Sequence, residues 1–264
     1  MTPVLFIGHG TPMNAIEDNR FSRQWVQLGK TLPRPKAILC VSAHWETART
    51  KVTAMENPET IHDFGGFPHE LYQQQYPAPG LPGLAEKICT LIPLVTPDHD
   101  WGLDHGAWSV LRHIYPDADI PVVQLSISRE RDMQYHYDLG KALRFIRNEG
   151  VMIIGSGNMV HNLWMVRSGK DGFNNRLAYD WASRINEKII SAIMDRDHNS
   201  LIDYTGLDPE TELAIPTQEH YIPLLYALGA SDKEEEIEVF SNEVVSGSLS
   251  MASLVIGSFR RDQA

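Results

Sequence analysis

The sequence predicts a single α/β domain, and three observations lead to this prediction. Short apolar runs, such as residues 4–7, 37–42 and 151–154, are too short for helices and are typical of buried strands. Stretches with the apolar spacing of helices lie between these runs, as expected when strands and helices alternate. The chain has 264 residues, of which 42% are hydrophobic, and can bury one substantial core. We therefore expect residues 1–264 to form one domain.

The predicted elements alternate along the chain. Strands are expected at 4–7, 37–42, 51–55, 121–127, 151–154, 237–240 and 253–256, and helices at 18–30, 81–91, 133–147 and 173–194. Two more helices are expected to start at Asp104 and Thr217, which are both suitable N-cap residues. The first two strands and the helix between them form a βαβ unit, whose right-handed crossover makes the strands parallel. Their carboxyl ends therefore lie at the same edge of the sheet.

Three histidines follow predicted strands. His9 lies between two glycines after the first strand, His44 follows the second, and His161 follows strand 151–154 and a Gly-Ser-Gly turn. Ligands of open α/β sheets collect at the carboxyl ends of the strands, so these imidazoles are candidates for a functional site. For each of them the alternative is an incidental histidine in a turn.

Two further histidines are expected at helix starts. His105 would lie in the first turn of a helix capped by Asp104, where the helix dipole favours a neutral ring that hydrogen-bonds. Residues 98–108 also contain three Asp and two His, which is compatible with a metal site. His220 would lie in the first turn of the helix that starts at Thr217, where it would face a cleft.

This set of five histidines, without a cysteine thiolate, indicates a metal centre. Sites made of imidazoles alone, or of imidazoles and carboxylates, suit Fe(II), Zn(II) and similar ions, and a site with open coordination positions is catalytic. The spacing from His9 to His44 to His220 is scattered along the chain and has low specificity by itself. Metal binding is nevertheless the leading interpretation.

The composition indicates a soluble, cytoplasmic protein that binds small molecules. A net charge of −11 argues against nucleic acid or an anionic membrane as a partner. The two cysteines, Cys40 and Cys89, give neither a disulfide framework nor a CxxC metal motif. No apolar run reaches the length of a membrane span, and the start lacks the features of a signal peptide. A homo-oligomer is possible, because acidic soluble enzymes are often dimers, but no segment identifies an interface.

Seven segments add information that spacing cannot give. They are Gly8–Met13, Val41–Trp45, Ile61–Pro68, Tyr76–Gly80, Asp104–Gly106, Gly155–Asn162 and Pro216–Tyr221. Together, and in this order, they resemble the 4,5-DOPA extradiol dioxygenase family, a branch of the class III extradiol ring-cleavage dioxygenases. The resemblance covers nearly the whole chain. It implies an α/β fold with a central, mostly parallel or mixed sheet flanked by helices, and a mononuclear metal site at the carboxyl ends of the strands.

The resemblance also implies roles for the histidines. His9, His44 and His220 would hold the metal. His161 would lie beside it as the catalytic acid/base, and would become a fourth ligand if zinc fills the site. His105 would be a second catalytic imidazole in the pocket, which hydrogen-bonds the substrate or bound oxygen.

One feature departs from the wider superfamily, whose better-known members use two His and one Glu as ligands. Here the third position matches His220, and Glu219 is its neighbour in the sequence. Neighbouring side chains on a helix point about 100° apart, so both residues cannot easily bind one ion. Three neutral imidazoles leave the ion with one more positive charge than two imidazoles and a carboxylate would. This favours binding of a catecholate and also makes zinc occupancy plausible.

The activity that the resemblance implies is extradiol cleavage of a catechol, such as DOPA or a related phenolic, by dioxygen. The cofactor would be one divalent metal ion, Fe(II) for turnover or Zn(II) as an occupant, and the product a ring-opened semialdehyde. Two alternatives stay open, a zinc-dependent hydrolase and a non-catalytic binding protein on the same scaffold. Aromatic walls for the ring are expected from the loop 62–68, Trp45, Trp164 and Tyr221, with ordinary packing as the alternative for each.

Overall fold

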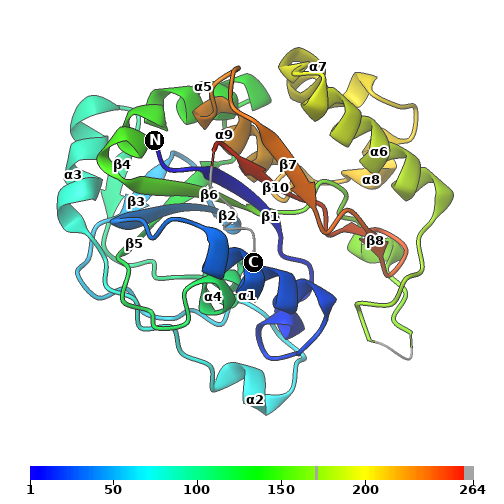
Figure 1. Ribbon diagram of the computed structural model, residues 1–264, viewed down its shortest axis with the longest axis horizontal. Coiled ribbons are helices and arrows are strands. Elements are labelled where there is room, and N and C mark those ends of the chain that lie inside the picture. The colour runs from blue at the N-terminus through cyan, green and yellow to red at the C-terminus, as the bar shows by residue number, and fades with distance from the viewer. Residues whose placement is uncertain (170–171, 259–264) are drawn as a thin grey trace.

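The computed structural model describes residues 1–169 and 172–258, and it contains one large sheet with helices on both faces (Figure 1). The strands are β1 (Val4–Gly8), β2 (Ala37–Thr47), β3 (Lys51–Thr53), β4 (Thr96–Asp98), β5 (Val122–Ser128), β6 (Val151–Gly157), β7 (Ile237–Phe240), β8 (Val244–Val245), β9 (Leu249–Ser250) and β10 (Ser253–Ile256). The sheet has eight strands in the order β4-β3-β5-β2-β6-β1-β10-β7, and β8 pairs with β9 separately.

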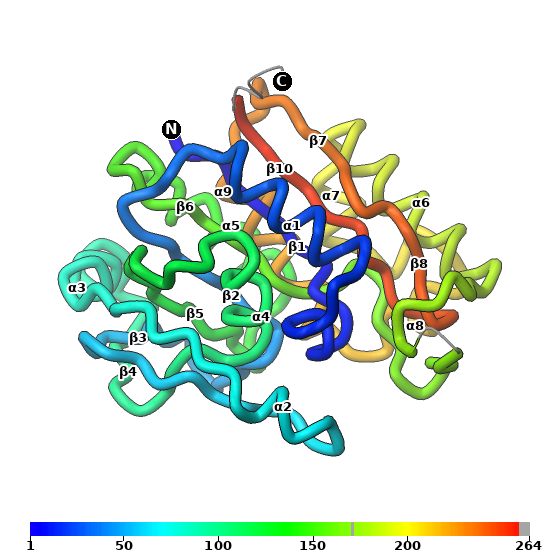
Figure 2. The backbone as a smooth tube through the Cα atoms, turned by 60° about the horizontal axis from the view of Figure 1, so that its bottom comes forward, coloured from blue at the N-terminus to red at the C-terminus, as the bar shows by residue number. Residues whose placement is uncertain are grey.

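The helices form a layer on each face of the sheet. The α-helices are α1 (Arg20–Thr31), α2 (His69–Tyr72), α3 (Pro82–Leu91), α4 (His105–Ile114), α5 (Met133–Leu143), α6 (Asp180–Met194), α7 (His198–Ile202), α8 (Thr211–Ala214) and α9 (Ile222–Ala230). The 3-10 helices are η1 (Pro12–Ala15), η2 (Arg144–Glu149), η3 (Leu163–Met165) and η4 (Tyr204–Gly206). In Figure 2, α1 lies in front of the sheet, and α6 and α7 lie behind it. The apolar core on the α1 side of the sheet contains Trp25 and Trp108, and the core on the α6 side contains Ile185 and Leu224.

The sheet is mixed, with a parallel centre, as predicted. Strands β5, β2, β6 and β1 run parallel, whereas β3, β10 and β7 pair antiparallel with their neighbours β5, β1 and β10. The predicted βαβ unit is present as β1, α1 and β2, and β6 lies between its two strands. The carboxyl ends of β1, β6 and β2 are thus adjacent at one edge of the sheet, which brings the segments that carry His9, His161 and His44 together.

Strand β2 is longer than the sequence predicted. It was expected to end before His44, but it continues to Thr47. Its register against β5 shifts between Val41 and Glu46, because the pairing passes from Val41–Leu125 to Glu46–Ile127. Over this interval β2 advances by five residues and β5 by two, so β2 bulges. His44 lies inside the bulge, a feature that commonly re-aims side chains next to active sites.

The predicted helix start at Thr217 is wrong. Helix α9 begins only at Ile222, with Pro223 in its first turn, where the missing N–H of proline is tolerated. The Thr217 hydroxyl donates to Oε1 of Glu219 at 2.9 Å and caps no helix. His220 consequently lies in the turn before α9. By contrast, the predicted cap of α4 is confirmed, since Asp104 accepts a hydrogen bond from the backbone N–H of Ala107 at 3.2 Å.

Other helix boundaries differ from the predictions in ways that leave the fold unchanged. The predicted helix 173–194 starts only at Asp180, and the predicted helix 133–147 changes to a 3-10 helix at Arg144. Neither cysteine is in a disulfide, with Cys40 buried in β2 and Cys89 half-buried. Within residues 1–169 and 172–258, no helix combines the length and the apolar character needed to cross a bilayer.

The buried His136 makes the stability depend on pH. Its Nδ1 lies 3.0 Å from the Tyr226 hydroxyl, in the contact between α5 and α9. Burial lowers the pKa of His136 from 6.5 to about 4. The folded protein therefore binds this proton less readily than the unfolded chain. The stability that depends on a neutral His136 is fully present above pH 6.5. It is lost as the pH falls towards 4, which lowers the free energy of unfolding by about 3 kcal/mol.

We predict that His136→Gln reduces this pH dependence. Glutamine can hydrogen-bond the Tyr226 hydroxyl and does not titrate, while the other histidines titrate equally in both proteins. Urea unfolding at several pH values between 6.5 and 4 should show a loss of stability that is smaller in the variant by about 3 kcal/mol. An equal loss in the two proteins would contradict the assignment.

Candidate metal centre

Five imidazoles converge at the carboxyl edge of the sheet. The ring centroids of His9, His44 and His220 form a nearly equilateral triangle, with distances of 5.0 Å (His9–His44), 5.3 Å (His9–His220) and 5.0 Å (His44–His220). His105 lies 3.9 Å from the ring of His44, and His161 lies 3.5 Å from the ring of His220. The structure therefore brings together every candidate histidine of the sequence analysis.

These imidazoles are mostly buried, and burial decides their charge. Burial first, and the neighbouring imidazoles next, lower the pKa of His9 and His220 well below 6.5. The same two causes lower the pKa of His44, although the carboxylate of Asp63 opposes them. Burial lowers the pKa of His161 to about 4. At neutral pH these rings are neutral, which is the form that binds metal ions.

The proton of His9 is placed by a chain of two hydrogen bonds. The Ser156 hydroxyl donates to the carbonyl of Gly106 at 2.6 Å, which uses its only hydrogen. Nδ1 of His9, 3.0 Å from the same hydroxyl oxygen, must therefore be the donor in that contact. As a result, Nε2 of His9 carries a lone pair, and this atom faces Nε2 of His44 at 3.2 Å.

Asp63 places the proton of His105 and lies close to His44. Its Oδ2 lies 2.9 Å from Nδ1 of His105 and 3.5 Å from Nδ1 of His44. Burial disfavours the charge of Asp63, but the hydrogen bonds of His105 and the interaction with both rings outweigh it and lower the pKa. A carboxylate is only an acceptor, so His105 presents Nδ1–H to it and keeps Nε2 free. The sequence analysis assigned no role to Asp63, although it lies within the segment Ile61–Pro68.

Glu219 places the proton of His220. Its Oε1 accepts from Nδ1 of His220 at 2.9 Å, so Nε2 of this ring is also free. The backbone of His220 is fixed against β6, because the N–H of Asn158 donates to its carbonyl at 2.8 Å. A Cβ on Gly157 would lie 2.1 Å from that carbonyl oxygen, so only glycine permits this approach. The sequence analysis expected that Glu219 and His220 could not both bind one ion, and here Glu219 hydrogen-bonds the His220 ring from its outer side.

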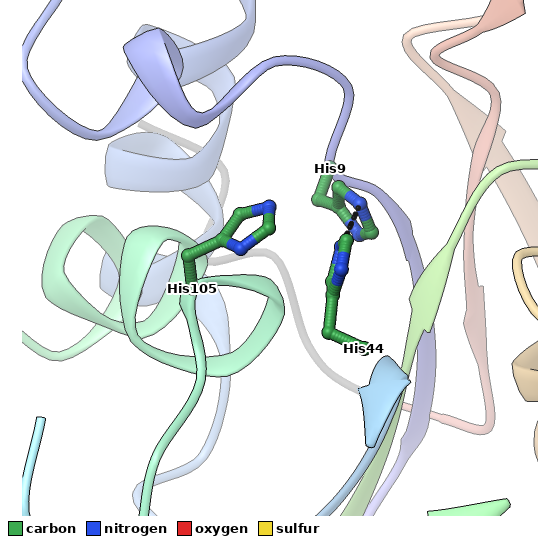
Figure 3. A group of neighbouring side chains, drawn as sticks. All are labelled: His9, His44 and His105. Carbon is green, nitrogen blue, oxygen red and sulfur yellow. Dashed lines mark hydrogen bonds between the residues drawn. The ribbon is translucent and has the colours of Figure 1, made fainter. Parts of the chain in front are cut away.

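The pair of Nε2 atoms at 3.2 Å has the separation of two ligands of one ion. Nitrogens about 2.0–2.1 Å from a common metal, at angles between tetrahedral and octahedral, lie about 2.9–3.4 Å apart. Nε2 of His9 carries a lone pair, so the contact with His44 is a hydrogen bond in which Nε2–H of His44 donates (Figure 3). A cation that replaces this hydrogen would be bound by both nitrogens, so these residues fit a divalent metal.

Two residues are placed to complete a triad around this pair. The ligand atoms of His9, His44 and His105 all lie within 4.8 Å of one another. Figure 3 shows the His105 ring directed from α4 towards the other two. On the other side, His220 completes the triangle of centroids, and its ligand atom also groups with those of His161 and Glu219.

His161 stacks on His220 with an angle of 9° between the ring planes. Imidazole lone pairs lie in the ring plane, so those of parallel rings do not converge. With centroids 3.5 Å apart, an ion about 2.1 Å from one ring nitrogen stays well beyond bonding distance from the other ring. In this arrangement His161 and His220 cannot both bind the same ion.

The aromatic side chains near the centre differ in their exposure. Trp45 is 3% exposed and stacks on Trp101. Tyr221 is fully buried, and its hydroxyl donates a hydrogen bond to the Leu201 carbonyl at 2.9 Å. The alternative of ordinary packing thus applies to both. Phe64 contacts His105 edge to face with centroids 5.4 Å apart. Trp164, just after His161, is 80% exposed.

Comparisons with known proteins identify the family. Residues 3–256 match the family described as the catalytic LigB subunit of aromatic ring-opening dioxygenase. The chain is 48% identical over 261 residues to a protein of Escherichia coli K12 named 4,5-DOPA dioxygenase extradiol, with 97% of this chain and 94% of the relative covered. A protein of Beta vulgaris with the same name is 39% identical, and 94% of each chain is covered.

A solved structure agrees with these relatives. The crystal structure of an uncharacterized protein from Escherichia coli K12 matches with a TM-score of 0.83 at 43% identity, covering 97% of this chain and 100% of the other. The resemblance found from the sequence motifs is therefore confirmed. The chain belongs to the LigB family, and this protein is an extradiol-type aromatic ring-opening dioxygenase.

Proposed function

We propose that this enzyme uses one divalent metal ion to cleave a catechol ring beside its two hydroxyl groups with dioxygen, which gives a ring-opened semialdehyde. The substrate is DOPA or a related phenolic, as the names of its relatives suggest. Fe(II) is the ion for turnover, and Zn(II) is an alternative occupant. The observation that carries this proposal is the pair of Nε2 atoms of His9 and His44, which face each other at 3.2 Å.

His9, His44 and His220 are the proposed ligands. Their ring centroids are 5.0–5.3 Å apart, Ser156 and Glu219 hold Nδ1 of His9 and His220, and Asp63 lies 3.5 Å from Nδ1 of His44. His105 is the proposed pocket imidazole beside this triad. Since its Nδ1–H is committed to Asp63, only its Nε2 is free to hydrogen-bond the substrate or oxygen.

When bound, the iron would acidify the catechol hydroxyls and hold the ring and dioxygen next to each other. His161 is the proposed acid/base. Burial keeps its ring neutral at pH 7, so it can accept a proton from a catechol hydroxyl. Its stacking on the proposed ligand His220 keeps it beside the bound substrate without binding the ion. The same nitrogen can later return the proton to the reacting oxygen.

A cytoplasmic location and a homo-oligomeric assembly also stay predictions. The two free cysteines support a reducing compartment. The net charge of −11 argues against an anionic partner. Neither property is needed for the proposed reaction.

The proposed function predicts oxygen consumption that depends on both iron and a catechol. The protein should be loaded with Fe(II) without oxygen, mixed with L-DOPA or another catechol, and then exposed to oxygen in an electrode cell. We expect one oxygen consumed for each catechol and a new visible absorption band. The zinc-loaded protein is the control. If no catechol supports uptake and the zinc form hydrolyses an ester, the enzyme is a hydrolase.

His161→Ala should separate chemistry from metal binding. We expect kcat to fall by about 100- to 10,000-fold, the usual range for a general acid/base, while metal affinity stays within about threefold. Single-turnover oxygen uptake and metal titration measure the two effects. His99→Ala, which changes an exposed histidine, is the matched control. A His161→Ala enzyme with normal turnover would show that the acid/base is another residue.

A comparison of His220→Ala with His105→Ala should identify the third ligand. We expect His220→Ala to weaken zinc binding by more than 100-fold, beyond the usual effect of losing a residue behind the ligands. His105→Ala should change zinc affinity by less than about tenfold and lower kcat/KM instead. The opposite result would mean that the ion is held by His9, His44 and His105.

A further inference from the structure

One carboxylate serves two imidazoles of the centre. We propose that Asp63 is a positioning residue that fixes both the metal ligand His44 and the pocket imidazole His105 through a single side chain. The inference rests on the proposed function, because that is where His44 becomes a metal ligand.

The loop that carries Asp63 is tied to the start of α4. The N–H of Ile61 donates to the carbonyl of Leu103 at 2.7 Å, and the indole of Trp108 donates to the carbonyl of Ile61 at 2.8 Å. Phe64, on the other side of Asp63, packs edge to face on His105. These contacts hold the carboxylate at the amino end of α4, where the helix dipole favours a negative charge.

Both oxygens of Asp63 bind His105. Oδ1 accepts from its backbone N–H at 2.8 Å, and Oδ2 accepts from its Nδ1–H at 2.9 Å. This clamp fixes the position of the residue and the rotation of its ring. With the ring fixed, its Nε2 is directed away from Asp63.

A second imidazole, His44, lies close to Oδ2. Nδ1 of His44 lies 3.5 Å from this atom, and its ring centroid is 3.9 Å from that of His105, with 45° between the planes. Ser156 and Glu219 each hold only one ring of the centre, His9 and His220. Among the residues that the structure describes, Asp63 is the carboxylate that lies near Nδ1 of both a proposed ligand and the pocket imidazole.

Asparagine at position 63 could not keep all three contacts of the aspartate with His105 and His44. An amide has one acceptor oxygen, and its NH₂ group can only donate. Oδ2 is the atom that lies near both rings, so the NH₂ group either takes its place and faces both Nδ1 atoms, or takes the place of Oδ1 and faces the backbone N–H of His105. In the first orientation both rings would have to carry the hydrogen on Nε2 instead of Nδ1, and in the second the clamp on His105 is lost. For His44, a hydrogen on Nε2 blocks the lone pair that binds the ion. Asp63→Asn thus alters metal binding without changing the volume of the side chain.

The test is zinc affinity, measured by competition with a chromophoric chelator, which needs no turnover. We expect Asp63→Asn to weaken zinc binding by about 10- to 100-fold, the usual effect of losing a residue that orients a ligand. Co²⁺ loading should also give an altered visible spectrum, because the ligand geometry changes. At saturating metal, kcat should fall as well, because the ring of His105 is no longer held in place.

Asp98→Asn is the matched control. Asp98 is a buried carboxylate at the end of β4, and it accepts from the N–H groups of Asp100 and Trp101 at 3.0 and 2.8 Å, and from Lys51 at 2.7 Å. It contacts no imidazole of the centre. Asp98→Asn should keep wild-type zinc affinity and the wild-type Co²⁺ spectrum.

His44→Ala separates this inference from the proposed function. If His44→Ala binds zinc as the wild type does, the proposed ligand set is wrong. If His44→Ala loses zinc while Asp63→Asn keeps full affinity and an unchanged Co²⁺ spectrum, the positioning role is wrong and the ligand set stands. Equal losses in Asp63→Asn and Asp98→Asn would also overturn the positioning role, since the effect would then come from loop packing.

Discussion

The centre depends on hydrogen bonds that fix the Nδ1 hydrogen of three of its rings. Without them an imidazole can rotate and exchange its nitrogens with carbons, and either nitrogen can carry the hydrogen. Ser156, Asp63 and Glu219 remove this freedom in His9, His105 and His220 and leave Nε2 as the free nitrogen. Nε2 of His9 then faces Nε2 of His44 at 3.2 Å, the separation of two ligands of one ion. The acceptors behind the rings therefore prepare nitrogen lone pairs for a metal ion.

The sheet explains how residues far apart in the sequence reach one point. Because β6 lies between β1 and β2, three parallel strands end side by side and deliver three histidines. The other two come from opposite faces, His105 from α4 and His220 from the turn before α9. Each approaches closely through a glycine, since a Cβ on Gly106 would lie 2.4 Å from the Ser42 hydroxyl, and one on Gly157 would meet the His220 carbonyl. The site is thus built where the two helical layers meet the edge of the sheet.

Local patterns predicted what depends on local sequence. Apolar runs marked the buried strands, the βαβ rule made β1 and β2 parallel, and Asp104 marked the start of α4. The bulge at His44 was not predictable, because it arises from the register of β2 against β5. The start of α9 was misplaced, because Thr217 bonds to Glu219 instead of capping a helix. The role of Asp63 depends on a contact with a residue 42 positions away, which no pattern within its own segment indicates.

His161 and His220 are chemically identical side chains, but their parallel stacking prevents both from binding the same ion. In-plane lone pairs of parallel rings cannot meet at one ion, and this supports our proposal that the ring that Glu219 orients binds the metal and that the ring without this support transfers protons. Among the described residues, none donates to or accepts from the ring nitrogens of His161, which leaves them available to a ligand. Burial keeps that ring neutral, so it has a lone pair that can accept a proton. Ring orientation and the acceptor behind one of the two rings thus support the different roles that we propose for identical residues.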